Sequence, residues 1–95
     1  MVGIAFEWDR RKDSANRRKH GVGSTEASTV FDDPLSITIP DPDHDIDEER
    51  CVIIGMTRKQ NLLIVDHTVR EERVRPISAR PATNHDRRNY EETAS

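Results

Sequence analysis

The apolar residues of this chain are gathered into short runs that are separated by strongly polar segments. Residues 35–39 alternate apolar and hydroxyl-bearing side chains, which is typical of a strand with one buried face. Segments 50–57 and 61–68 carry nearly continuous apolar runs and are joined by a short turn at residues 58–60. Continuous runs are typical of strands covered on both faces, so the pattern predicts a central pair of strands.

Two further strands are predicted on either side of this series. Phe6 and Trp8 alternate with Ala5 and Glu7, which indicates a short first strand whose two rings anchor it in the core. Residues 73–78 form the last strand. Because Pro76 within it has no N–H to donate, this strand is expected to lie at a sheet edge or to contain a bulge.

Residues 10–20 are predicted to form a helix, although they contain almost no apolar side chain. Asp9 is a good N-cap, since its carboxylate can accept from the free N–H groups of the first turn. Gly21 is a good stop, because glycine adopts the left-handed conformation at little cost. A helix that is polar all round has little to bury, so it must bridge a partner or lean on its neighbours.

Two more helices complete the pattern. One begins at Ser24, carries apolar residues at helical spacing, and ends at Asp33 before a proline. The last follows Thr83 and is capped by Thr83 or Asn84. The order of elements predicts a single α+β domain over residues 1–95, with two N-terminal helices, a mainly antiparallel sheet of four to five strands, and one C-terminal helix.

The net charge of −3 conceals a strong separation of charge along the chain. Residues 7–20 carry six Lys or Arg and three acidic residues, and residues 57–90 carry eight Lys or Arg and four acidic residues. Residues 32–50 carry eight acidic residues and one arginine. This asymmetry indicates a cationic binding surface beside an acidic loop. A solvated surface of mixed charge explains the composition equally well.

The composition excludes several classes of protein. Cys51 is the only cysteine, so neither an intramolecular disulfide nor a cysteine zinc cluster can form. No apolar stretch approaches the roughly 18 residues of a membrane span, and the N-terminus lacks the apolar core of a secretory signal. We therefore expect a cytoplasmic protein that does not contact a membrane. The sequence contains no glycine-rich phosphate loop, and no cofactor is expected.

Alternating aspartates in residues 41–47 superficially resemble a calcium-binding loop. The pattern fails because Ile46 stands at the sixth position, where glycine is needed, and Val52 at the twelfth, where glutamate is needed. No dedicated metal site is expected.

Four residues of the first helix are candidates for binding nucleic acid. Helical spacing places Lys12, Asn16 and Lys19 on one face, with His20 beside them. Lysine charges, an asparagine donor and a histidine that can carry a proton all suit a phosphate backbone. The alternative is that these side chains only solubilise the helix.

A second candidate site is the segment RVRPISAR, residues 73–80. Arg73 and Arg75 point to the same face of a strand about 7 Å apart, and Arg80 lies just past the end of the strand. Parallel guanidinium groups at this separation suit successive phosphates or one scissile phosphate. The alternative is pairing with Glu71, Glu72 or the acidic loop.

His67 and Tyr90 are the candidates for proton transfer. RNA cleavage without a metal needs a base for the 2′-hydroxyl, cations for the phosphorane and an acid for the leaving 5′-oxygen. His67 at a strand end is the first choice, followed by Lys19, His20 and Tyr90. A single histidine at a strand end is more often structural.

Five stretches taken together resemble the BrnT family of ribonuclease toxins: FEWDRRKDSANRRKHGV, TEASTVFDDPL, DEERCVIIG, LLIVDHT and RVRPISARPAT. The similarity runs in order from Phe6 to Glu92. Its most specific parts are F-E-W-D, N-x-x-K-H-G-V, F-D-D-P and I-S-A-R. The resemblance implies a RelE-like α+β fold and a metal-independent endoribonuclease, the toxin of a type II toxin–antitoxin module, which cleaves RNA, with mRNA as the expected target, and arrests growth.

The resemblance also implies partners. These are RNA as substrate and a BrnA-like antitoxin that neutralises the toxin in a hetero-oligomer, for which a 2:2 assembly is one arrangement. Operator DNA is expected to be bound only through the antitoxin.

Residues that match the family pattern fall into two groups by expected role. The catalytic candidates are His67, Arg73, Arg75, Arg80 and Tyr90. The RNA-binding candidates are Lys12, Asn16, Lys19, His20 and Arg50.

Two departures from the family pattern bear on activity. Pro76 stands where an aliphatic residue is usual and is expected to affect the placement of Arg75 and Arg80. Asp66 replaces another aliphatic residue, so it is expected either to raise the pKa of His67 or to weaken RNA binding. An attenuated protein, acting as antitoxin partner and co-repressor without cleaving RNA, is therefore the alternative function.

Overall fold

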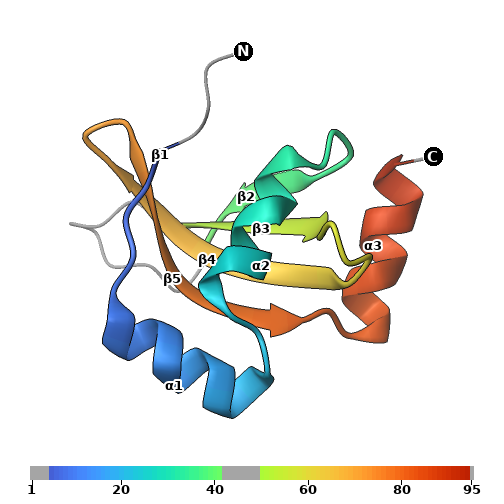
Figure 1. Ribbon diagram of the computed structural model, residues 1–95. Coiled ribbons are helices and arrows are strands. Elements are labelled where there is room, and N and C mark those ends of the chain that lie inside the picture. The colour runs from blue at the N-terminus through green and yellow to red at the C-terminus, as the bar shows by residue number, and fades with distance from the viewer. Residues whose placement is uncertain (1–4, 42–49, 95) are drawn as a thin grey trace.

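The computed structural model describes residues 5–41 and 50–94, and this part of the chain forms a five-stranded sheet with helices packed against it (Figure 1). The order of strands across the sheet is β1-β5-β4-β3-β2. The elements are β1 (Ala5–Phe6), α1 (Arg10–His20), α2 (Ser24–Ser28), the 3-10 helix η1 (Thr29–Asp32), β2 (Ile37–Pro40), β3 (Arg50–Met56), β4 (Leu62–Arg70), β5 (Arg73–Pro81) and α3 (Asn84–Ala94).

The sheet is mainly antiparallel, which confirms the predicted fold class. β2, β3, β4 and β5 pair in chain order as antiparallel neighbours, and β1 alone runs parallel to its neighbour, β5. β4 and β5 are joined through Glu71 and Glu72, whose φ angles are 52° and 64°. Positive φ at both central positions gives a tight hairpin whose twist matches that of the strands.

Pro76 lies at a bulge, as the sequence predicted. The pairing of β4 with β5 shifts register between Asp66 and His67, and Pro76 is the partner of His67 just after the shift. A bulge accommodates a residue without an N–H because pairing is already interrupted there.

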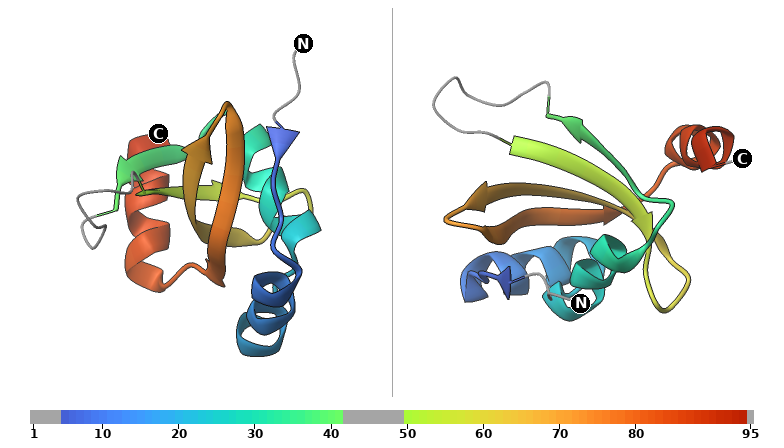
Figure 2. Two further views of the ribbon diagram at one scale, coloured as in Figure 1. Left: turned by 90° about the vertical axis from the view of Figure 1, so that its left-hand side faces the viewer. Right: turned by 90° about the horizontal axis from the view of Figure 1, so that it is seen from above.

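The helices lie on different sides of the sheet (Figure 2). α1, α2 and η1 cover one face, and α3 stands at the end of the other. Gly55 allows close packing on the first face, because a Cβ there would lie 3.0 Å from the carbonyl oxygen of Val30. The core between the sheet and the first three helices consists of Val22, Ala27, Val30, Ile53, Leu63, Val65 and Ala79.

α1 contains no buried residue and is held by polar side chains. Asp13 accepts from the N–H (2.8 Å) and the Oγ (2.6 Å) of Ser24 at the start of α2. The amide of Asn16 donates to the carbonyl oxygens of Val22 (2.9 Å) and Ala79 (2.8 Å) and accepts from the N–H of Ala79 (3.0 Å). The predicted caps are present: Asp9 accepts from two N–H groups of the first turn, and Gly21 ends the helix at φ 70°. The polar helix α1 is therefore attached to β5 by the hydrogen bonds of the Asn16 side-chain amide, which we call the amide clamp.

Several predicted details of the elements were wrong. β5 continues to Pro81 instead of ending at Ser78, so Arg80 lies within the strand and not just past its end, because its backbone still pairs with β4. Regular α-helix ends at Ser28 rather than Asp33, and the chain continues as η1. β2 begins at Ile37, two residues later than predicted. Trp8 lies beyond β1 and is 42% exposed, so it is not a core anchor; its ring stacks on Phe6 at 5.7 Å instead. No helix of the described residues is long and apolar enough to cross a membrane.

Candidate functional site

Arginines are concentrated on the sheet face opposite α1, α2 and η1, which we call the arginine face. Register places Arg50, Thr68 and Arg75 side by side on β3, β4 and β5. The next row toward the hairpin consists of Arg70 and Arg73, which are direct cross-strand partners. Because neighbouring strands lie about 5 Å apart, these guanidinium groups share one cationic surface.

Arg70 and Arg73 place two positive charges directly opposite one another in the sheet. Like charges directly opposite one another destabilise a sheet by up to about 1 kcal/mol. Neither side chain has an ion-pair partner among residues 5–41 and 50–94. Among the described residues, Arg75 pairs with the carboxylate of Glu7 at 3.5 Å and not with Glu71 or Glu72. Residues 42–49 of the acidic loop, the other partner in that alternative, lie outside the described residues. An exposed pair of this kind is weak enough for a bound phosphate to displace it.

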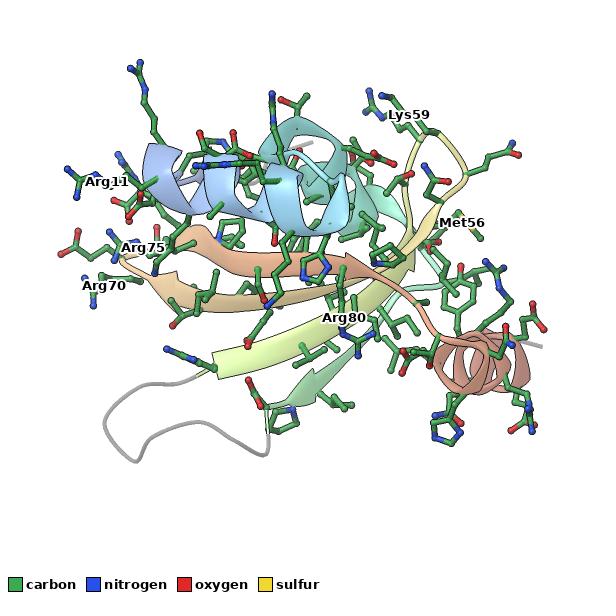
Figure 3. The ribbon with its side chains drawn as sticks, turned by 90° about the horizontal axis from the view of Figure 1, so that it is seen from below. Arg11, Met56, Lys59, Arg70, Arg75 and Arg80 are labelled. Carbon is green, nitrogen blue, oxygen red and sulfur yellow. The ribbon has the colours of Figure 1, made fainter. Side chains whose placement is uncertain are left out.

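Arg80 lies on the same face, farther along β5 toward α3 (Figure 3). It pairs in register with Ile64, whereas Arg70 and Arg75 lie at the hairpin end. The Nη1 atom of Arg80 donates to Oδ2 of Asp86 at 3.1 Å and to the carbonyl oxygen of Pro81 at 3.2 Å. Arg80 is thus fixed at its tip while its side chain is still 44% exposed.

A groove of about 530 Å³ runs over this part of the arginine face. Its floor is apolar and comes from β2, β3 and β4, whereas its polar groups come from β4, β5, α3 and Asp41, which directly follows β2. The floor consists of Ile37, Ile39, Val52, Ile54 and Ile64, and the polar groups include Asp66, Ser78, Arg80, Asp86 and Asn89. Ile39 is 53% exposed, so the apolar floor is open to a ligand.

α3 borders this groove and is held to the protein mainly by Tyr90. In residues 84–93 Tyr90 is the only buried side chain. Its hydroxyl donates to Oδ2 of Asp33 at 2.7 Å, and the same oxygen accepts from the N–H of Met56 at 2.8 Å. Burial, followed by the hydrogen bond to Asp33 and its charge, raises the pKa of Tyr90 to about 12. The hydroxyl of Tyr90 therefore keeps its proton and attaches α3 to Asp33.

Tyr90→Phe is expected to make the protein less sensitive to alkaline pH. An unfolded tyrosine ionises near pH 10, but folded Tyr90 keeps its proton to about pH 12. The contribution of the hydrogen bond between Tyr90 and Asp33 to the free energy of unfolding is fully present below about pH 10 and is lost as the pH rises toward 12. Denaturation at about pH 8 and about pH 11 should show a smaller alkaline loss for the variant, with about 1 kcal/mol less stability at neutral pH. Equal alkaline losses would contradict this assignment.

The structure does not bring His67 together with the arginines. Its ring is on the opposite face of the sheet, is 4% exposed, and meets Phe31 edge to face at 4.9 Å. Nδ1 lies 3.2 Å from the carbonyl oxygen of Val65. Burial lowers the pKa of His67, and the bond to Val65 only partly offsets that effect. Asp66 points into the groove instead, so the expectation that it raises the pKa of His67 was wrong.

The four candidates on α1 are also separated. Asn16 faces β5 and uses its amide for the clamp, so binding RNA through it would release α1. Lys12 and Lys19 are exposed, and His20 is half-buried at the other end of the helix from Lys12. Lys12 and Lys19 are the two of these side chains that are open to a nucleic acid.

No group of three or more His, Cys, Asp or Glu within the described part of the chain is arranged to hold a metal ion. The aspartates at positions 43, 45 and 47 lie outside the described residues.

A family model described as "Ribonuclease toxin, BrnT, of type II toxin-antitoxin system" matches residues 8–86. The chain belongs to the BrnT family. The match covers the arginine face and the start of α3 up to Asp86. As its description states, this family consists of ribonuclease toxins of type II toxin–antitoxin systems, which implies RNA as the class of substrate and an antitoxin as the class of partner.

Among solved structures, a match to a BrnT protein supports the same fold. The crystal structure of the Brucella abortus ribonuclease toxin BrnT superimposes with a TM-score of 0.66 at 20% identity and covers 86% of this chain and 100% of that chain. At this identity the likeness shows the fold alone. No curated protein sequence matched this BrnT-family chain.

Thr83 caps α3, as one of the two predicted cap residues, by accepting from the N–H of Asp86. Sequence reasoning missed two residues beside the site of this BrnT-family protein: Asp33 docks α3, and Asp86 bonds to Arg80. The spacing Thr83-x-x-Asp86 resembles a capping box and was the available signal. The role of Asp33 had no local signal, because its partner Tyr90 is 57 residues away.

Proposed function

We propose that this BrnT-family protein is an endoribonuclease that cleaves single-stranded RNA, with mRNA as its cellular target, and arrests growth until a BrnA-like antitoxin binds it. The observation that carries the proposal is the open arginine face. At one end Arg70 and Arg73 lie directly opposite one another and have no ion-pair partner among residues 5–41 and 50–94, and at the other end Arg80 lies beside the groove. Guanidinium groups bind phosphate oxygens in pairs and stabilise the charge that develops on a reacting phosphate.

Cleavage needs no metal in this proposal. The 2′-oxygen loses its proton and bonds to the adjacent phosphorus, the bond from phosphorus to the 5′-oxygen breaks, and that oxygen gains a proton. The products are a 2′,3′-cyclic phosphate and a 5′-hydroxyl. Arg80 stabilises the phosphorane, while Arg50, Arg70, Arg73 and Arg75 hold neighbouring phosphates.

The proton acceptor is Asp66 rather than His67. Asp66 lines the groove and lies diagonally across from Arg80, since Ile64 pairs with Arg80 and Asp66 with Ser78. For His67 to act, its ring would have to leave its contact with Phe31 and cross the sheet. Tyr90 would have to give up its bond to Asp33.

A second function is favoured by the same geometry. Neither the His67 ring nor the Tyr90 hydroxyl opens onto the arginine face, so the protein lacks two of its expected proton-transfer groups there. An antitoxin-binding co-repressor that does not cut RNA would retain the arginine face for partner binding.

Purified wild-type protein is expected to cleave single-stranded RNA equally well with and without a chelator, leaving cyclic phosphate ends. Induction in bacteria should stop growth, and co-expression of a BrnA-like antitoxin should restore it. The measurement is gel analysis of end-labelled RNA. Intact RNA combined with stable antitoxin binding would select the co-repressor, and cleavage that requires a divalent ion would exclude the metal-independent mechanism.

A further inference from the structure

Asp86 is the centre of a compact hydrogen-bond group at the start of α3. Its Oδ2 atom accepts from the N–H of Thr83 at 2.9 Å, from Oγ1 of Thr83 at 2.9 Å and from Nη1 of Arg80 at 3.1 Å. The N–H of Asp86 in turn donates to Oγ1 of Thr83 at 3.1 Å. The carboxylate therefore has two separate tasks, since it caps α3 and it holds the guanidinium of Arg80.

The contacts of Arg80 are confined to one nitrogen. Nη1 makes both hydrogen bonds, to Asp86 and to the carbonyl oxygen of Pro81. Within the described residues, Nε and Nη2 have no hydrogen-bond partner. Arg80 and Asp86 both line the groove. The edge of a guanidinium that carries Nε and one Nη is suited to two parallel bonds with a phosphate.

We propose that Asp86 is a positioning residue for the RNA-cleaving reaction, because it fixes the guanidinium of Arg80 so that its Nε–Nη2 edge is presented to the scissile phosphate in the groove. This role rests on the proposed function. A free arginine side chain loses considerable conformational entropy when a ligand orders it. Because the bonds of Nη1 already order the side chain of Arg80, this entropy is lost on folding and not when RNA binds. A site that is ordered in advance in this way accelerates the reaction.

The C-terminal helix thereby becomes part of the site without touching RNA itself. Asp86 can hold Arg80 only while α3 is docked, and Tyr90 docks α3 through Asp33. Desolvation raises the pKa of Asp86, but the bonds from Thr83 and the bond and charge of Arg80 outweigh it and hold that pKa below its usual value. The carboxylate is consequently ionised at neutral pH, as a strong bond to Arg80 requires.

The negative charge of Asp86 has an opposing effect, because a carboxylate beside the groove repels the phosphate of RNA. The side chain of Asp86 is 19% exposed and its Oδ2 is already bonded to three donors. The negative charge of Asp86 is thus partly neutralised by Arg80 and by the two donors of Thr83, whereas its bond to Arg80 orients the guanidinium directly. The orientation of Arg80 by Asp86 is therefore expected to matter more for catalysis than the repulsion between Asp86 and phosphate.

Two alanine variants separate positioning from helix capping. Asp86→Ala removes the bond to Arg80 and the cap, and Thr83→Ala weakens the same cap while it leaves the bond between Asp86 and Arg80 in place. With single-stranded RNA as substrate, Asp86→Ala is expected to lower kcat about 10- to 100-fold with little change in KM. Thr83→Ala should keep kcat close to wild type, and Asp86→Asn, which retains an acceptor without the charge, should be intermediate. Thermal melting of each variant verifies folding.

Each other outcome overturns the proposal. Equal losses of kcat in the two alanine variants would make Asp86 a helix cap only, and a gain of activity in Asp86→Ala would make it a competitor of the phosphate. A change confined to KM, or no change, would exclude positioning as well. In all of these cases the wild type still cleaves RNA. A wild type that leaves RNA intact overturns the proposed function itself, and with it this role.

Discussion

Asn16→Ala is expected to lower the free energy of unfolding by about 3 kcal/mol. The substitution deletes two donated hydrogen bonds and one accepted bond to the backbone. It leaves the N–H and C=O of Ala79, a 4% exposed residue, without their side-chain partner. An orphaned buried backbone group costs about 1–3 kcal/mol, and α1 has no buried side chain with which to compensate.

Urea denaturation of wild type and variant measures this loss. Arg11→Ala is the matched control, because Arg11 is exposed on the same helix and its side chain should matter by no more than about 0.5 kcal/mol. If Asn16 instead served mainly to bind RNA, Asn16→Ala would be as stable as Arg11→Ala and would lose only RNA affinity. That result would contradict the clamp.

Arg80→Ala is expected to reduce kcat/KM for RNA cleavage by about 100- to 1000-fold, the largest effect on activity. The substitution removes the only arginine of the arginine face that lines the groove within the described chain. Arg80→Lys keeps the charge but cannot form two parallel bonds, so it should recover only part of the rate. End-labelled RNA assays and growth after induction provide the measurements.

Arg58→Ala is the control for the effect of charge alone. Arg58 lies on the turn between β3 and β4, where it pairs with Asp32, and its side chain is 79% exposed. Losing it changes the net charge as much as losing Arg80 does, yet activity should stay near the wild-type value. If both variants lose activity equally, the effect is a general electrostatic one and the groove is not the site.

α1 and α3 show how polar helices can be retained in a small domain. Each has one side chain, Asn16 in α1 and Tyr90 in α3, that bonds to a distant part of the chain. A carboxylate adds a second link in each helix, Asp13 to Ser24 and Asp86 to Arg80. Such anchors bury little apolar surface, so the outer faces of both helices can be strongly charged. The consequence for function is that the exposed lysines of α1 and the carboxylate of Asp86 stand at fixed places beside the sheet.

The sequence alone determined the element order, both ends of α1 and the family, and it restricted Pro76 to a sheet edge or a bulge. These features depend on signals within a few residues of each other, such as the N-cap of Asp9, the left-handed Gly21 and the missing N–H of proline. Local backbone preferences are strong enough to be recognised without tertiary context. The motif combination that resembles BrnT toxins was likewise a property of the sequence.

Only the tertiary structure decided which candidates share a face. His67 and Asp66 are adjacent in sequence, but a strand sends neighbouring side chains to opposite faces, and packing determined that the His67 face became the core. Asn16 and Tyr90 appeared as RNA-binding or catalytic candidates because their partners, Ala79 and Asp33, lie 63 and 57 residues away. Such contacts depend on how the sheet is assembled, and no periodicity in one segment specifies them.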